Sequence, residues 1–283
     1  MNNKVWYITG ASKGLGLALV KKLLNKGYRV AATSRNLAEL KEAVGVDSND
    51  FLPLQVTLTD EKSVEKSIEK TFDWFGSLDV IVNNAGYGLA GALEELSDAE
   101  SRLNFEVNVF GTLNVIRKSM PHLRRQQRGH ILNIASIGGF TGAFPGFGIY
   151  CATKFAVHGL TESLAEEIKP LGLYATVISP GYFRTQFLTD GSLRVPDNPI
   201  AEYSKVREMQ ELHQKEINHN QPGDPDKAAE VMIELTEMSQ PPVHLFLGQD
   251  AYNLADQKIA AVHKDLETMK ASATATAFEE VTA

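Results

Sequence analysis

The sequence has 283 residues, with 28 Lys and Arg against 35 Asp and Glu, which gives a formal net charge of -7. That balance argues against a nucleic-acid partner or an anionic membrane surface, because both select for a basic face. The lone cysteine, Cys151, cannot form an internal disulfide, and Met1–Tyr7 shows no secretory signal. No apolar run approaches the roughly 20 residues of a membrane span. We therefore expect a soluble, cytoplasmic protein with no membrane or nucleic-acid partner.

Short apolar runs rich in Val and Ile alternate with segments of helical periodicity. Continuous apolar runs are typical of strands buried on both faces, so the alternation predicts a doubly wound α/β fold. The predicted strands are Val5–Thr9, Arg29–Ser34, Phe51–Val56, Leu78–Asn83, Gly129–Ala135, Leu173–Ser179 and Val243–Leu247. The predicted helices are Leu15–Asn25, Leu37–Val44, Glu61–Phe75, Ala99–Gln126, Ile149–Lys169 and Asp226–Met238. We expect one three-layer domain, residues 1–283, around a seven-stranded parallel sheet.

Two places break this rhythm. Between Ser179 and Asp226 nearly 50 residues contain no predicted strand, and a connection of that length is typical of a lid or binding loop. A polar helix is expected within it near Ala201–Asn218, and we place a substrate lid at about 186–222. After Gly248 an amphipathic helix, about Tyr252–Lys270, begins a C-terminal extension of about 250–283, in which residues 272–283 have too little periodicity to interpret.

The first predicted strand ends in Thr9-Gly10-Ala11-Ser12-Lys13-Gly14-Leu15-Gly16, and a helix follows at once. Glycine allows a sharp turn and a close approach of backbone to a phosphate. The start of a helix adds free N–H groups and the positive end of the helix dipole. The turn therefore predicts a pyrophosphate site, with a tight strand–helix turn that binds nothing as the alternative.

The second predicted strand ends in Ser34 and Arg35, where NAD-preferring sites carry a carboxylate for the ribose 2′-hydroxyl. That carboxylate would repel a 2′-phosphate, whereas the planar arginine fork binds one. Lys13 can add a second positive charge from the neighbouring turn. Either cation alone is more often a solvated surface residue, but the pair, with no acid at the strand end, favours NADP(H) over NAD(H).

Tyr150 and Lys154 stand four apart in a predicted helix, so they share a face and lie within reach of each other. A free tyrosine has a pKa of about 10. A cation about 4 Å away at an effective dielectric of about 20 contributes about 4 kcal/mol, enough to lower that pKa by up to about three units. We therefore predict an acid/base pair, with an ordinary helix-surface pair as the alternative.

Together with other motifs, these residues resemble the short-chain dehydrogenase/reductase family in its non-extended branch. The resemblance rests on the Thr9–Gly16 turn, Asn83-Asn84-Ala85-Gly86, Asn108, Ser136, Tyr150-x-x-x-Lys154 and Pro180-Gly181, in the family's order over residues 4–248. It implies a Rossmann fold and hydride transfer between a nicotinamide and a carbonyl or alcohol. The run Pro242–Gly248 with Asp250-Ala251-Tyr252 resembles a subgroup related to 17β-hydroxysteroid and retinol dehydrogenases.

The resemblance also implies a role for each matched residue. Tyr150 would exchange a proton with the substrate oxygen, Lys154 would bind the nicotinamide ribose, and Ser136 would orient the substrate. Asn108 would hold a water that links Lys154 to solvent. The implied cofactor contacts are Gly10, Ser12, Lys13, Gly14, Leu15, Gly16, Ser34, Arg35, Gln55, Val56, Asn84, Ala85, Gly86, Tyr150, Lys154, Pro180, Gly181 and Thr185. Because Gln55 stands where many members have Asp, we expect a shifted adenine contact there.

Other reactive side chains carry weaker signals. We expect Cys151 to be small buried filler and His158 to be a satisfied core histidine. His213 and His219, six residues apart on a polar helix, are expected to be solvated. No set of residues has the spacing of a metal site, so no metal is predicted.

The loops expected around the nicotinamide are rich in apolar and aromatic side chains, which is the usual lining of a small-molecule pocket. They comprise Tyr87, Phe140, Phe144, Phe147, Ile149, Tyr182, Phe183 and Phe187. We expect a lipophilic ketone, aldehyde or secondary alcohol as substrate, although half of these rings could simply pack the lid.

Three functions remain open at this point. We favour an NADPH-dependent carbonyl reductase. The alternatives are an NAD(P)+-dependent alcohol or hydroxysteroid dehydrogenase that works oxidatively, and a non-catalytic NADP-binding sensor. Apolar residues on more than one face of Ala99–Gln126 and Ile149–Lys169 predict a homodimer or homotetramer.

Overall fold

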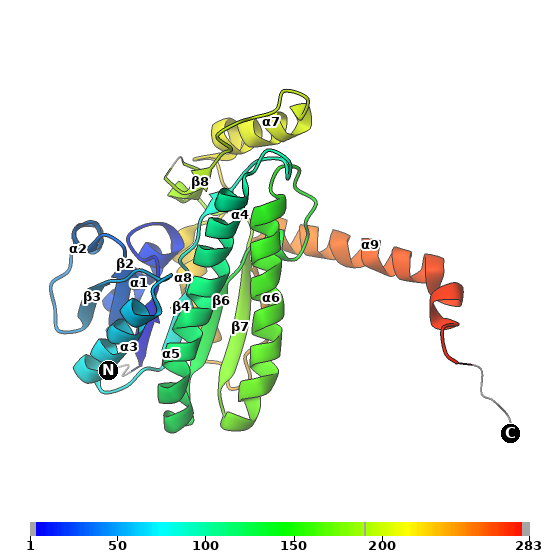
Figure 1. The fold of residues 1–283 in the computed structure, drawn as a ribbon. Helices are drawn as coiled ribbons and strands as arrows, with labels where there is room; N and C mark the ends of the chain where they lie inside the picture. Colours follow the sequence, from blue (N-terminus) through cyan, green and yellow to red (C-terminus); the bar gives the residue numbers. More distant parts are fainter. Residues whose placement is uncertain (1–3, 190, 279–283) are drawn as a thin grey trace, which may run out of the picture.

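Seven parallel strands form the central sheet of the computed structural model, which describes residues 4–189 and 191–278 (Figure 1). Their order is β3-β2-β1-β4-β6-β7-β9. The strands are β1 (Val5–Ile8), β2 (Arg29–Ser34), β3 (Phe51–Gln55), β4 (Val80–Asn83), β6 (His130–Ile134), β7 (Tyr174–Pro180) and β9 (His244–Leu247). Every predicted strand is present with its ends shifted by at most two residues, so the prediction of a seven-stranded parallel sheet is confirmed.

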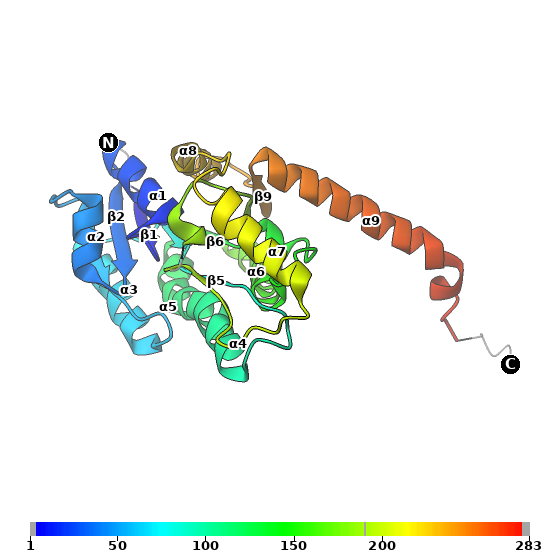
Figure 2. The same cartoon turned by 90° about the horizontal axis from the view of Figure 1, so that it is seen from above.

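Helices cover both faces of the sheet and give the predicted three layers (Figure 2). On one face α1 (Gly14–Asn25), α2 (Leu37–Val44) and α8 (Pro225–Leu235) bury one apolar cluster. On the other, α3 (Glu61–Phe75), α5 (Gly111–Gln126) and α6 (Gly148–Ile168) bury a second. The strands are buried on both sides because successive side chains point into alternate clusters.

The arrangement places a binding crevice between β1 and β4. These strands are neighbours in the sheet although β2 and β3 intervene in the chain, so the connections after β1 and β4 leave in opposite directions. Open α/β sheets bind ligands at such a switch point, at the carboxyl ends of the strands. The Gly10–Gly16 turn and Asn84–Gly86 both begin there.

The long helix predicted at Ala99–Gln126 is interrupted. It starts as α4 (Asp98–Phe105), capped by Ser97 and Glu100, passes through a π-helical turn, η1 (Glu106–Phe110), and continues as α5. A π turn leaves no apolar periodicity of its own over five residues, which is why the sequence predicted an uninterrupted helix.

The segment predicted as a strand-free lid contains a short strand. β8 (Leu193–Arg194) pairs in parallel with β5 (Gly88–Leu89), which follows the Asn84–Gly86 loop. The polar helix is present as α7 (Ser204–Glu211), followed by a second π turn, η5 (Leu212–Ile217). Asp190, inside the predicted lid, lies outside the described residues.

The C-terminal helix, α9 (Gln249–Thr274), begins earlier than predicted and projects away from the sheet (Figures 1 and 2). Only Ala251 and Ala255 of this helix are buried, against residues near the end of β6 and in β9. Residues 279–283 of the predicted extension, like residues 1–3 of the predicted domain, lie outside the described residues. Within the described ranges no helix has the length and hydropathy needed to cross a membrane.

Candidate active site

A cavity of about 1230 Å³ runs across the carboxyl ends of the strands and gathers most of the predicted site residues. Those on its wall are Gly10, Ser12, Lys13, Gly14, Leu15, Ser34, Arg35, Val56, Asn84, Ala85, Gly86, Ser136, Tyr150, Lys154, Pro180, Gly181 and Thr185. Three predicted residues, Gly16, Gln55 and Asn108, are not on the wall. Of the predicted apolar lining, Phe140 and Ile149 also lie elsewhere.

The glycine turn has a geometry that only glycine supports. Gly10 and Gly14 have φ values of 64° and 62°, in the left-handed region. A Cβ on Gly10 would lie 2.7 Å from the Cα of Ala85, and one on Gly16 would lie 2.5 Å from Nδ2 of Asn84. Gly16 is therefore needed for close packing beneath the turn rather than for ligand contact.

The start of α1 suits an anionic group. Its first turn carries no acidic residue, and Lys13 at the N-cap makes no capping side-chain hydrogen bond, so the terminal N–H groups face the cavity without a competing acceptor. The asparagine loop is fixed alongside, because Asn84 Nδ2 donates to the carbonyl oxygens of Thr9 (2.9 Å) and Gly10 (3.0 Å). These residues fit the phosphates of a dinucleotide.

The end of β2 combines basic and acidic groups. Arg35 is exposed at the cavity wall, and Lys13 Nζ donates to the carbonyl oxygen of Gly191 at 3.3 Å. Glu39 and Glu42, which the sequence analysis did not consider, line the same end. Gln55 Nε2 donates to the Arg35 carbonyl at 3.0 Å, so this amide supports the arginine backbone from outside the cavity.

Ser136 and Tyr150 meet at the inner end of the cavity. Ser136 follows β6, and its Oγ accepts from the backbone N–H of Gly138 at 3.0 Å. The side chains of Ser136 and Tyr150 both line the cavity here, and a Cβ on Gly138 would lie 3.4 Å from Ser136 Oγ and 3.8 Å from the Tyr150 ring. Lys154, one turn further along α6, lies with Nζ 5.8 Å from the centre of the Tyr150 ring and donates to the Ile134 carbonyl at 3.0 Å. Of the four residues predicted to be catalytic, the structure therefore brings Ser136, Tyr150 and Lys154 together at the cavity.

Burial dominates the electrostatics of this group. It raises the pKa of Tyr150 well above its usual value of 10, against a smaller lowering by the neighbouring Ser136 hydroxyl. The same burial lowers the pKa of Lys154 to about 8. The expectation of a lowered phenol pKa is therefore wrong for the chain by itself, because burial disfavours the charged phenolate and is the largest influence on this group.

Asn108 lies behind the cavity, in the π turn η1. Its Oδ1 accepts from the N–H of Tyr87, and its Nδ2 donates to the Tyr87 carbonyl and to Thr153 Oγ1, each at 3.1 Å. A Cβ on Gly86 would lie 3.0 Å from Asn108 Oδ1 and 3.4 Å from Lys154 Nζ. The Asn108 side chain thus connects the asparagine loop to α6 and positions residues that line the site.

A family model described as short chain dehydrogenase matches residues 4–193. The chain belongs to the short-chain dehydrogenase/reductase family. It is 33% identical to oxidoreductase BOA17 of Botryotinia fuckeliana over 89% of this chain and 91% of that one. It is 32% identical to the 3-ketodihydrosphingosine reductase of Bacteroides thetaiotaomicron over 88% of this chain and 89% of that one. These similarities establish an oxidoreductase of this family.

Solved structures agree with this assignment. A short-chain dehydrogenase from Streptomyces avermitilis superposes with a TM-score of 0.89 and 32% identity, covering 97% of this chain and 100% of that one. A Brucella melitensis 3-ketoacyl-(acyl-carrier-protein) reductase complexed with NADH and ElxO with NADP bound align at TM-scores of 0.72 and 0.71. These two proteins are 26% and 27% identical to this chain, respectively. Each alignment covers 86% of this chain and 96% of the solved structure. Members of the short-chain dehydrogenase/reductase family thus bind both nicotinamide dinucleotides.

The substrate side of this short-chain dehydrogenase/reductase contains a histidine that the sequence analysis placed wrongly. His213 was predicted to be solvated, but it is 4% exposed and lines the cavity. Its ring packs 4.8 Å from that of Phe147. The spacing of Val206, Met209 and His213 on one helical face was the signal that could have identified it. His219 is exposed, as predicted, and Cys151 is buried, as predicted, while also lining the cavity.

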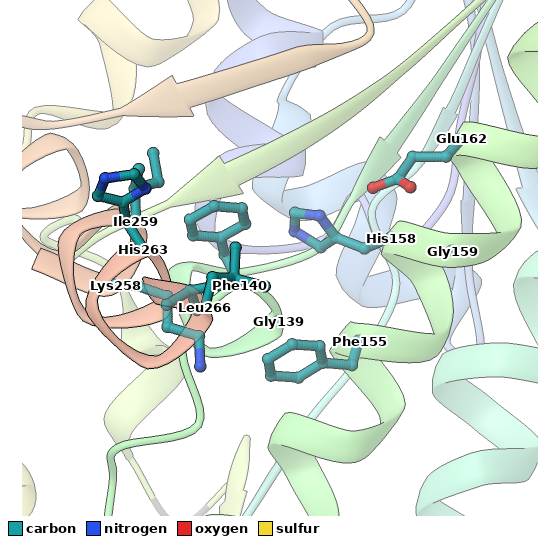
Figure 3. Close-up of a pocket in the computed structure, with 11 residues that line it drawn as sticks. Gly139, Phe140, Phe155, His158, Gly159, Glu162, Lys258, Ile259, His263 and Leu266 are labelled. Atoms are coloured by element: carbon teal, nitrogen blue, oxygen red, sulfur yellow. The ribbon is translucent and has the colours of Figure 1, made fainter. Parts of the chain in front are cut away.

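His158, predicted to be a core histidine, is buried, and its Nε2 lies 2.9 Å from Ser179 Oγ. With Glu162 and His244 it forms a group whose ligand atoms lie within 4.8 Å of one another, a grouping that the sequence analysis missed. The rings of His158 and His244 are stacked at an interplanar angle of 27°, and a stacked pair does not direct two nitrogens at one ion. Figure 3 shows His158 and Glu162 among the residues that line a second cavity, and Tyr150 is not part of that lining. We assign no metal to this group.

Proposed function

We propose that the chain is an NADPH-dependent carbonyl reductase/alcohol dehydrogenase that acts on a lipophilic ketone, aldehyde or secondary alcohol. The observation that carries the proposal is that the Ser136 and Tyr150 side chains lie side by side at the inner end of the cavity, with Lys154 Nζ 5.8 Å from the centre of the tyrosine ring. Two hydroxyls that meet at one point can both bond to a single carbonyl oxygen. NADPH, when bound, supplies the hydride.

Residues of the chain supply the proton that the substrate oxygen takes up. Ser136 and Tyr150 bond to the carbonyl oxygen, and Tyr150 donates its proton as that oxygen becomes an alkoxide. Lys154, with a pKa of about 8, keeps its charge at neutral pH and stabilises the phenolate that remains. A buried phenol with a raised pKa holds its proton at neutral pH, which is the protonation state that reduction of a carbonyl requires.

The preference for NADPH rests on Arg35 and Lys13. Both line the cavity at the β2 end, and Ser34 stands where an NAD-preferring site would carry an acid. The negative charge of Glu39 would repel a 2′-phosphate and so opposes this preference. One of its carboxylate oxygens, Oε1, is already hydrogen-bonded, because it accepts from Asn36 Nδ2 at 2.8 Å. The arginine fork remains available for the 2′-phosphate of the cofactor.

The substrate class rests on the apolar wall near Tyr150. Phe144, Phe147, Phe187 and Leu188 line the cavity there, and the last two belong to the lid that we place at about 186–222. The Bacteroides thetaiotaomicron relative is named as a reductase of 3-ketodihydrosphingosine, in keeping with reduction of a ketone. Tyr182 and His213 add the polar groups nearest this wall.

The proposal includes a cytoplasmic homodimer or homotetramer. Leu103 on α4, Phe110 in η1 and Phe155 on α6 are 42–44% exposed, and large apolar groups on a surface are typical of a protein–protein contact. The lone cysteine is consistent with a reducing compartment.

The proposal is tested with a panel of ketones, aldehydes and steroids assayed with NADPH and NADH by the absorbance of the reduced nicotinamide. We expect turnover of apolar carbonyls, faster with NADPH. Turnover only of alcohols with NAD+ would support the oxidative alternative. Tight NADPH binding without turnover of any compound would support the sensor.

A further inference from the structure

The projecting part of α9 carries an apolar stripe that no described residue covers. Ile259, Val262, Leu266 and Met269 are 40–63% exposed. Their alternating spacing of three and four residues extends to Tyr252 and Ala255 on one side and to Ala273 on the other. This is the heptad pattern of a coiled-coil seam, in which a helix buries its stripe against another helix. A free helix gains little stability from propensity alone, so such a stripe indicates a missing partner.

The stripe borders a groove beside α6. A cavity of about 580 Å³ lies between the two helices, with Ile259, Val262 and Leu266 on one wall (Figure 3). Phe155 of α6 and Phe140, which follows β6, form the opposite wall. Since α9 diverges from α6 beyond its first turns, the α9 stripe and the exposed Phe155 do not cover each other (Figure 1).

When two copies of α9 run antiparallel, the charged residues beside the stripe of one copy face residues of opposite charge on the other. If Ile259 of one copy lies opposite Val262 of the other, Leu266 comes to the level of Ala255, which its own chain buries, and lies beside the exposed Tyr252 one turn away. Lys258 then comes beside Asp265 of the second copy, and Asp265 beside its Lys258. The antiparallel orientation also sets the middle of one α9 against the groove of the other, because the α9 wall of that groove runs from Lys258 to Leu266.

We propose that α9 is a pairing arm through which two copies of this chain associate, with the middle turns of each arm along the α6–α9 groove of the other. The contact is twofold and isologous, because the same stripe and the same groove serve both copies. This contact shares only Phe155 with the apolar residues of α4, η1 and α6 on which the proposed homodimer or homotetramer rests. It does not depend on the proposed reaction.

The first test is sedimentation velocity on the full chain and on two variants that add one negative charge to α9. Leu266→Asp places the charge in the seam, whereas Thr268→Asp places it on the opposite face of the same helix. We expect Leu266→Asp to have half the mass of the wild type and Thr268→Asp to have the wild-type mass. Circular dichroism and NADPH binding check that both variants are folded. Wild-type mass for a folded Leu266→Asp would overturn the proposal, as would a monomeric wild type.

A charge exchange tests the orientation. Asp265→Lys alone sets two like-charged pairs across the antiparallel contact and should weaken association about tenfold. Adding Lys258→Asp restores opposite charges there, and association should return to within about twofold of the wild type. In a parallel pair the lysine introduced at 265 would instead face Lys270 of the second copy. Failure of the double variant to recover would overturn the antiparallel arm.

Discussion

The hydroxyl of Tyr182 donates a hydrogen bond to Nε2 of His213 across 2.9 Å. The direction is fixed by the other ring nitrogen, because Nδ1 lies 2.8 Å from the Met209 carbonyl, which can only accept. Burial lowers the pKa of His213 and keeps the ring neutral. The α7–η5 segment of the proposed lid is therefore tied to the loop after β7 by a bond that requires a neutral histidine.

His213→Phe should destabilise the lid more than the double variant Tyr182→Phe/His213→Phe, which removes both partners of the hydrogen bond. The variant leaves the Tyr182 hydroxyl without its acceptor, at a cost of about 1–3 kcal/mol. Tyr182→Phe/His213→Phe removes the unsatisfied group as well and should recover part of the loss. Thermal unfolding and kcat/KM of the two single variants and the double variant measure the coupling. Strictly additive effects would show that the hydrogen bond contributes nothing.

Tyr150→Phe should lower kcat for carbonyl reduction by a factor of about 100 or more, because the proton donor is lost. NADPH binding, measured by fluorescence titration, should be unchanged within about twofold, since the ring remains. Tyr7→Phe is the matched control, because it removes a buried hydroxyl, bonded to Ser67 at 2.7 Å, from a residue that does not line the cavity. Substantial activity in Tyr150→Phe would contradict the assignment of the acid.

Arg35→Asp should raise the KM for NADPH by about 10- to 100-fold, the cost of losing a charged hydrogen bond to phosphate, and change that for NADH far less. Glu39→Gln removes a negative charge from the same end and should change the KM for NADPH in the opposite direction. Steady-state kinetics with both cofactors provides the comparison. Equal effects of Arg35→Asp on the two cofactors would contradict the phosphate role.

Gly10→Ala should abolish cofactor binding and destabilise the fold. Its φ of 64° disfavours a side chain by about 1–3 kcal/mol, and the new Cβ would lie 2.7 Å from Ala85 Cα. Gly27→Ala separates the two effects, because Gly27 also has a positive φ, 76°, but has no described atom within 4 Å of the added Cβ. Denaturant titration should show a smaller loss for Gly27→Ala, with NADPH binding intact. Equal losses would mean that backbone strain alone matters at the turn.

Stability should fall as the pH drops below about 6.5. Burial lowers the pKa of His130 to about 3 and that of His158 to about 4, whereas an unfolded histidine has a pKa near 6.5. Between these values the unfolded chain binds more protons, and each histidine removes about 1.4 kcal/mol per pH unit. His130→Gln should make the fall in Tm between pH 6.5 and 4.5 less steep, while His219→Gln, at an exposed position, should leave it unchanged. A steepness unaffected by His130→Gln would contradict this account.

The sequence predicted the strands well and placed Tyr150 and Lys154 on one helix, because both predictions depend on local patterns. Runs such as Arg29–Ser34 are apolar at every central position, and Tyr150 and Lys154 are related by a fixed helical spacing. What it missed depends on tertiary surroundings. The pKa of Tyr150 is set by how deeply α6 lies under the lid, and His213 is buried only because Tyr182 and Phe147 come from elsewhere in the chain.

The π turn at Glu106–Phe110 has a further consequence. Such a turn contains one residue more than an α-helical turn, so the helix before it is rotated by about 100° relative to an uninterrupted helix. The face that α4 presents is thus set by the length of the chain as well as by its residue types. A homologue that lacks one residue of this π turn can keep an asparagine aligned with Asn108. The residue aligned with Leu103 would then lie on a different face of α4. Gaps at 106–110 in an alignment would therefore distinguish relatives with differently oriented α4 surfaces.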